Sequence, residues 1–122
     1  MEGAFSHNSE LPGGRAPFWI KDHALDGIGL RPGDAVSVDS GKEPRGGELV
    51  LVEIETDDGG SDRMVRRYFE RGEDVLLKAE NDAFPDVVLA SSRILLVGVV
   101  KTRVRFEAAS DDRTWVVEEP LD

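Results

Sequence analysis

The sequence contains no cysteine and only two histidines, His7 and His23. Without thiols the chain forms neither disulfide bonds nor thiolate-based metal or catalytic centres, and neither histidine has a second histidine at metal-ligand spacing. We therefore expect no metal site and no cofactor, and we interpret both histidines as exposed or capping side chains.

Long apolar runs and an excess of basic charge are missing as well. The chain has 15 basic and 25 acidic side chains, a formal net charge of −10. No apolar stretch approaches the roughly 20 residues that cross a bilayer, and the start at Met1, Glu2 and Gly3 does not resemble a secretion signal. We expect a cytoplasmic protein that binds neither membranes nor, directly, nucleic acid.

The length of 122 residues and the 39% apolar content suit a single globular domain. We expect a loose, polar lead-in over residues 1–15 and a β domain over residues 16–106. Residues 107–122 form an acidic C-terminal extension, in which Trp115, Val116 and Val117 are a candidate extra strand.

Most of the chain reads as short strands separated by glycine and proline. The segment 63–71 could also line a helix face, but Gly59 and Gly60 before it and the turn signal at 71–73 favour a hairpin. The pattern predicts a mostly-β fold, a compact barrel or sandwich. The expected strands span 17–21, 35–39, 48–55, 63–71, 74–78, 87–90 and 94–106.

The most distinctive motif runs from Leu25 to Asp34, L-D-G-I-G-L-R-P-G-D. Pro32 and Gly33 suit the centre of a type II turn, whose second residue needs a positive φ, and the Asp34 carboxylate can bridge the turn. Taken alone, this motif indicates only a turn that leads into a strand.

Together with the pieces that follow it, this motif gives an order that resembles the C-terminal domain of the LexA and UmuD family of self-cleaving Ser–Lys peptidases, which are related to signal peptidases. The resemblance covers roughly residues 17–106 and implies the compact mostly-β fold of that family. Ala24-Leu25 lies at the family's Ser-Met step and Val65-Arg66-Arg67 at its Val-Lys-Arg step. The other matching segments are 29–34, 35–39, 47–52, 76–85 and 96–100.

The resemblance also shows what this sequence lacks. In the family a serine hydroxyl attacks a peptide carbonyl and a buried neutral lysine takes its proton. Here the serine position holds Ala24 and the lysine position holds Arg66, whose guanidinium stays protonated. No replacement stands nearby. The nearest serines, Ser37 and Ser40, lie beyond the turn, and Lys21 and Lys78 fall outside the Ser-Met and Val-Lys-Arg steps. We interpret Ala24 and Arg66 as a degenerate dyad.

These observations favour a non-catalytic dimerisation, protein-interaction or regulatory module, with a second copy or another protein as its partner. We expect a peptide cleft at Leu25, Arg66 and Arg67. The expected interface is the late strand 99–106, through an exposed row of backbone groups. Its candidate residues are Val99, Lys101, Arg103 and Arg105.

Two alternatives remain open from the sequence. The chain could be a Ser–Lys peptidase, either active through other residues or inactivated by an engineered Ser→Ala change at position 24; that change alone leaves Arg66 unexplained. It could instead be an acidic regulator of a nucleic-acid-binding protein, since its net charge is −10 and its C-terminal end is acidic.

Overall fold

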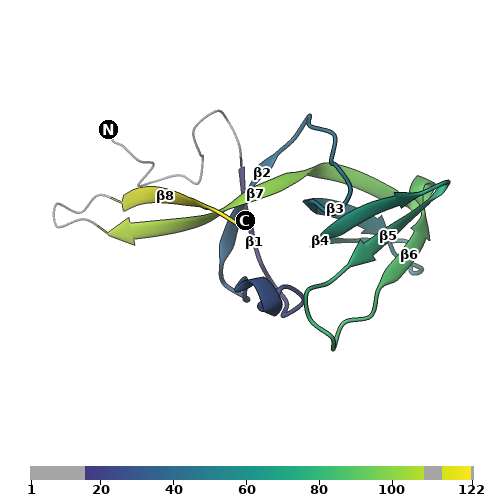
Figure 1. Cartoon of the computed structure of the whole chain (residues 1–122), viewed down its shortest axis with the longest axis horizontal. Coiled ribbons are helices and arrows are strands. Elements are labelled where there is room, and N and C mark those ends of the chain that lie inside the picture. The colour runs from purple at the N-terminus through teal and green to yellow at the C-terminus, as the bar shows by residue number, and fades with distance from the viewer. Residues whose placement is uncertain (1–15, 109–113, 122) are drawn as a thin grey trace.

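The computed structural model describes residues 16–108 and 114–121, and nearly all of its regular structure is β-strand (Figure 1). This confirms the prediction of a mostly-β fold. The lead-in 1–15 and His7 lie outside the described residues. The strands are β1 (Ala16–Trp19), β2 (Ala35–Asp39), β3 (Leu49–Glu55), β4 (Ser61–Arg71), β5 (Asp74–Lys78), β6 (Val87–Ala90), β7 (Ile94–Ala108) and β8 (Thr114–Pro120), with short 3₁₀ helices η2 (Asp26–Ile28) and η3 (Ser91–Arg93).

The strands form one antiparallel sheet in the order β1-β2-β7-β3-β4-β5-β6, and β8 pairs with β7 beside this path. β7 is the central strand, because it pairs with β2, β3 and β8 along different parts of its length. Register shifts interrupt its pairing with β2 near Val36 and with β3 near Leu51. Such irregularities bend and twist a strand, which allows one sheet to enclose a core.

The core consists of two apolar clusters, and β3 contributes to both. Leu49 and Leu51 belong to one cluster with Leu25, Val36 and other residues, whereas Val50, Val52 and Ile54 belong to the second with Val75 and Leu77. Successive side chains of a strand point to opposite faces, so a strand buried on both faces must be apolar throughout. This accounts for the unbroken L-V-L-V run that begins β3.

The ambiguous segment 63–71 is a strand, as its flanking glycines indicated. It lies within β4, which forms a hairpin with β3 in a register that runs from Leu49 opposite Arg67 to Glu55 opposite Ser61. Gly59 has a φ of +87° in the connecting turn, a conformation that favours glycine.

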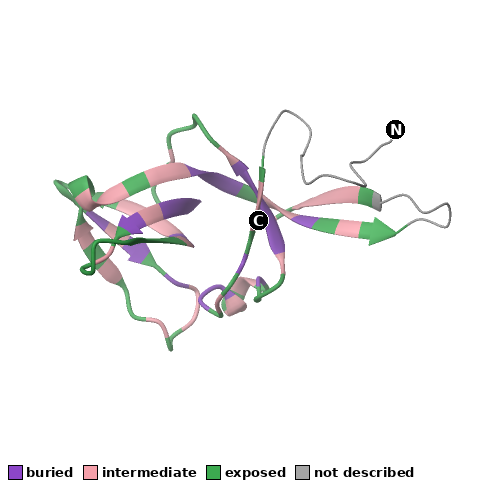
Figure 2. Cartoon of the chain, turned by 180° about the vertical axis from the view of Figure 1, so that it is seen from behind, coloured by how far each residue is buried: buried purple, intermediate pink, exposed green. Residues whose placement is uncertain are grey.

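The last two strands form a hairpin that projects from the body of the domain (Figure 1). β7 continues beyond the predicted end at residue 106, and its residues 102–108 pair with 114–120 of β8. The extra strand expected around Trp115 is therefore present. We call these paired segments, 102–108 and 114–120, the arm. Buried positions are concentrated in the body, and the arm carries mostly intermediate and exposed residues (Figure 2).

One expectation about β7 is wrong. Most of residues 99–106 do not offer an open row of backbone groups, because Val99 and Val100 pair with both β3 and β2, and Arg103 and Val104 pair with both β2 and β8; the last two residues pair with β8 alone. Val99 is only 1% exposed and belongs to the interior rather than to an interface. The alternating charges of this segment reflect the two faces of a central strand, not a free edge.

Candidate functional site

The predicted turn at residues 31–34 fixes the loop that precedes β2. The Asp34 amide donates to the Arg31 carbonyl at 2.9 Å, and the Arg31 amide donates to the Asp34 carboxylate at 2.9 Å. Gly33 has a φ of +96°. Both the need for glycine and the bridging role of the Asp34 side chain are thus confirmed.

The loop that carries Ala24 is held against the segment after β5 by two backbone hydrogen bonds. The Glu80 amide donates to the Ala24 carbonyl at 2.7 Å, and the Gly27 amide donates to the Glu80 carbonyl at 2.8 Å. A Cβ atom at Gly27 would lie 2.4 Å from that carbonyl oxygen, so only glycine allows this approach. Ala24 itself is completely buried.

Arg66 extends from β4 into the same region, and its side chain is only 8% exposed. Its Nη1 donates to the Val65 carbonyl at 2.9 Å, and its Nη2 lies 3.4 Å from Asp22 Oδ2. The guanidinium carbon is 5.7 Å from the centroid of the Phe84 ring, within range of a cation–π contact. A buried cation of this kind needs such partners to offset its desolvation.

Asp22 connects the two positions that the resemblance assigns to the dyad. While its Oδ2 faces Arg66, its Oδ1 accepts the backbone amide of Ala24 at 3.0 Å. We call Asp22, Ala24, Arg66 and Phe84 the corner. The sequence analysis did not single out Asp22. The available signal was its position two residues before Ala24, because an aspartate side chain readily accepts a hydrogen bond from the backbone amide two residues later.

The other residues of the expected peptide cleft do not line an open cleft. Leu25 is 1% exposed and packs in the first core cluster, so its place in a cleft is wrong. The Arg67 Nε donates to Glu80 at 2.8 Å, and its Nη1 donates to the Gly47 carbonyl at 3.1 Å. Arg67 therefore ties β4 to its neighbouring segments.

The basic residues of the late strand are held by intramolecular contacts. Lys101 pairs with Glu48 at 3.0 Å, and Arg105 pairs with Glu107 and Glu119, each at 3.1 Å. Arg103 instead reaches the loop of the corner, where its Nη2 donates to the carbonyl of Gly29 at 2.5 Å. Arg103 thus links β7 to the segment that carries Ala24.

Glu48 and Tyr68 are among the groups whose environment shifts their pKa. The pKa of Glu48 lies below its ordinary value, because the carboxylate accepts the Arg45 amide at 2.8 Å and pairs with Lys101. Burial and the nearby Glu70 carboxylate raise the pKa of Tyr68.

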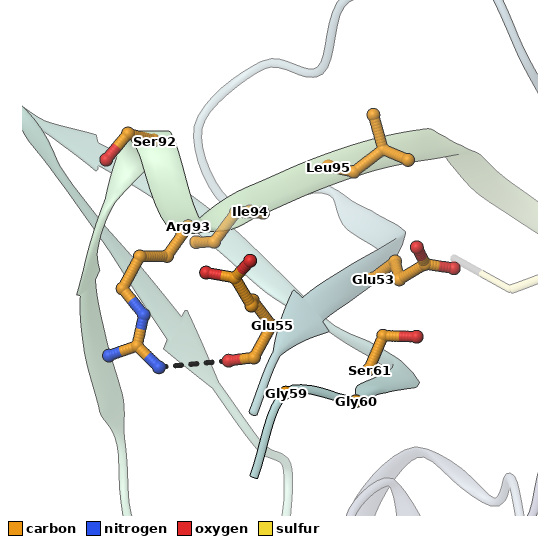
Figure 3. Close-up of a pocket in the computed structure, with 9 residues that line it drawn as sticks. All are labelled: Glu53, Glu55, Gly59, Gly60, Ser61, Ser92, Arg93, Ile94 and Leu95. Atoms are coloured by element: carbon orange, nitrogen blue, oxygen red, sulfur yellow. Dashed lines mark hydrogen bonds between the residues drawn. The ribbon is translucent and has the colours of Figure 1, made fainter. Parts of the chain in front are cut away.

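Two open cavities of similar size lie at different places in the body. One, of about 540 Å³, adjoins the loops of the corner and is lined by Asp26, Gly27, Lys78, Ala79, Glu80, Asn81 and Asp82. The other, of about 520 Å³, lies between the β3–β4 hairpin and the start of β7, where Arg93 donates to the Glu55 carbonyl at 2.9 Å (Figure 3). None of the residues proposed from the sequence lines this second cavity.

Metal ligation finds no support in the part of the chain that the structure describes, where no three histidine, aspartate or glutamate side chains are grouped to hold an ion. His23 is exposed, and its Nδ1 lies 3.1 Å from Asp26 Oδ2. Over the same described ranges, no helix is long and apolar enough to cross a membrane.

Comparison with known proteins agrees with this architecture. The model of the Peptidase S24-like family matches residues 8–101. The LexA repressor of Vibrio vulnificus is 30% identical over 95 residues, which cover 75% of this chain and 44% of the relative. The LexA repressor of Deinococcus radiodurans is 28% identical over 85 residues, which cover 70% of this chain and 39% of the relative. The chain belongs to the Peptidase S24-like family, and it matches about two fifths of the length of these relatives.

Proposed function

We propose that this chain is a Peptidase S24-like domain without peptidase activity, which acts by binding a second copy of itself or another protein. One observation carries the proposal. At the two positions that the resemblance assigns to the serine and the lysine stand a buried methyl group and a guanidinium, and both residues contact the same carboxylate, that of Asp22.

This arrangement opposes peptide hydrolysis in three ways. Ala24 has no side-chain oxygen to act as a nucleophile, and a guanidinium such as that of Arg66 is not a general base. The Ala24 amide, a donor that could polarise a substrate carbonyl, already donates to Asp22 at 3.0 Å. These three features act together, so a single substitution does not restore the chemistry.

Support for a binding role comes from the aromatic side chains around the arm. Trp19 is 51% exposed and stacks on Phe106 of β7 with ring centroids 5.6 Å apart. Trp115 of β8 is 46% exposed. One exposed tryptophan thus lies beside the projecting hairpin and one on it, and exposed aromatic side chains are enriched in protein–protein contact surfaces, where they contribute much of the binding free energy.

The loss of activity is tested by following the intact mass of the full chain at neutral and alkaline pH. We expect no cleavage of the wild type. In the variant A24S/R66K the lysine would face Asp22, whose charge would raise the lysine pKa and keep it from acting as a base. The triple variant, in which Asp22→Asn is added, removes that charge. It therefore tests whether the fold can still support Ser–Lys cleavage. Cleavage by the wild-type chain would contradict the proposal.

Association is tested by light scattering over a range of protein concentrations. We expect the mass of a dimer for the wild type and a shift towards the monomer for Trp19→Ala and Trp115→Ala. Leu95→Ala is the matched control, since Leu95 is also a large, exposed apolar residue, 58% exposed, but lies in the body. A monomer at all concentrations would contradict self-association, and an equal effect of Leu95→Ala would contradict the role of the arm.

A further inference from the structure

We infer that the corner is a carboxylate-binding site, which Asp22 fills in the free protein and which a carboxylate of a partner protein can take over. The inference rests on the proposed function only in treating the corner as a place of binding instead of hydrolysis. Its two donors are the Ala24 amide and the Arg66 guanidinium, and both already hold a carboxylate, that of Asp22.

The geometry matches what a carboxylate requires. One oxygen of Asp22 receives the Ala24 amide at 3.0 Å, and the other faces Arg66 Nη2 at 3.4 Å. The guanidinium is kept in place independently of Asp22, since it also donates to the Val65 carbonyl and lies over the Phe84 ring. Donors that are oriented before a ligand arrives lose little entropy when they bind it.

The hold of Asp22 on this site is weak enough for exchange. Its 3.4 Å contact is longer than the roughly 2.7–2.9 Å of a good charge-assisted hydrogen bond. The neighbouring pair of Arg67 and Glu80 reaches 2.8 Å. The Asp22 side chain is also 33% exposed, in contrast to 8% for Arg66. Water can therefore solvate the Asp22 carboxylate when a ligand displaces it.

The surroundings indicate which carboxylates fit. The cavity of about 540 Å³ flanks the corner: it is lined by Gly27 of the loop that carries Ala24 and by Glu80, whose backbone bonds to both Ala24 and Gly27. Three carboxylates line it, those of Asp26, Glu80 and Asp82, against the one amine of Lys78. A segment with several acidic residues would be repelled there. The ligand is therefore a protein segment with a single carboxylate among uncharged or basic residues.

The first experiment uses acetate as the probe and follows the amide signals of the full-length chain by NMR. We expect saturable shifts at the Ala24 amide and the Arg66 guanidinium in Asp22→Ala, with an affinity at least tenfold higher than in the wild type. Acetamide, which has the same shape without the charge, should cause none. Asp57→Ala is the matched control, because it removes one negative charge at a side chain that is 100% exposed and far along the sequence.

The outcome depends on Arg66. Acetate binding should be lost when Arg66→Met is added to Asp22→Ala. Equal acetate affinity in Asp22→Ala and Asp57→Ala, or binding that survives Arg66→Met, would overturn the inference. If Asp22→Ala does not fold, Asp22→Asn replaces it: the amide oxygen still accepts the Ala24 amide but no longer neutralises Arg66, and acetate should again bind more tightly than to the wild type.

The source of the carboxylate is distinguished with two short peptides, one with a free C-terminus and no acidic side chain, the other amidated with one internal glutamate. Binding of either peptide to the wild type, and at least tenfold more tightly to Asp22→Ala, supports the inference and identifies the source. If neither binds to Asp22→Ala, the inference fails. The mass and cleavage measurements are independent of this result, so failure of the carboxylate site and failure of the proposed function are distinguishable.

Discussion

The corner and the arm adjoin the same sheet but differ in how their residues find partners. In the corner, Ala24 and Gly27 are joined to Glu80 by backbone hydrogen bonds, and the Arg66 side chain is almost fully buried. Beside and within the arm, Trp19 and Trp115 leave about half of their surface exposed. The comparison shows that the corner is maintained by contacts within the chain, whereas the tryptophans beside and within the arm leave apolar surface exposed.

The largest expected effect is a loss of stability in the corner. Gly27→Ala should lower the free energy of unfolding by about 2–3 kcal/mol, a cost typical of forcing extra atoms into a packed site. The new Cβ would meet the Glu80 carbonyl oxygen at 2.4 Å. Gly46→Ala is the control, since nothing lies within 4 Å of a Cβ there. Urea denaturation measures both. Equal urea midpoints for the two variants would show that the corner accommodates the extra methyl group. The corner would then not be more tightly packed than the arm.

A smaller effect is expected where Trp19 meets the arm. Trp19→Ala removes the stacked contact with Phe106 and should cost about 1 kcal/mol in the free energy of unfolding, the usual value of an aromatic pair. Trp115→Ala should cost less, because no stacked partner of Trp115 is seen among the described residues. Both are measured at protein concentrations low enough to suppress association. A loss of several kcal/mol for either variant would mean that the arm is part of the core.

The smallest effect is a pH-dependent one at the root of the arm, where Glu48 pairs with Lys101. A carboxylate whose pKa is lowered on folding stabilises the protein above its ordinary pKa, here 4.5, and this stabilisation is lost as the pH falls through the lowered pKa. Glu48→Gln should therefore cost about 0.5–1 kcal/mol at pH 7 and nothing well below pH 4. Glu43→Gln, at an exposed position, is the control. If Glu48→Gln still lowers the free energy of unfolding in acid, the effect comes from packing and not from the charge of Glu48.

Strand positions could be predicted largely from the sequence, because alternation and turn residues are local signals. The turn at Pro32 and Gly33 and the strand at Trp115 are examples. The pairing of β7 could not be predicted in the same way. Whether Val99 faces a neighbour on one side or on both depends on strands that lie far apart in the sequence, so alternating charge was mistaken for a free edge.

The candidate site shows the same limit. The resemblance pointed to Ala24 and Arg66, and the structure places both residues in contact with Asp22. The bond from Arg66 to Asp22 joins residues 44 positions apart, and no local pattern announces such a contact. Leu25 shows the converse error: it stands next to Ala24 in the sequence, yet its side chain turns into the core.

The length of β7 has a mechanical consequence. One strand of 15 residues crosses the body and continues into the arm, and Arg103 binds the Gly29 carbonyl at the point where the strand leaves the body (Figure 1). The arm is therefore connected to the body both through the continuous backbone of β7 and through this hydrogen bond. A partner that displaced the paired strands of the arm would therefore also act on the loop around residue 29, which Arg103 joins to β7.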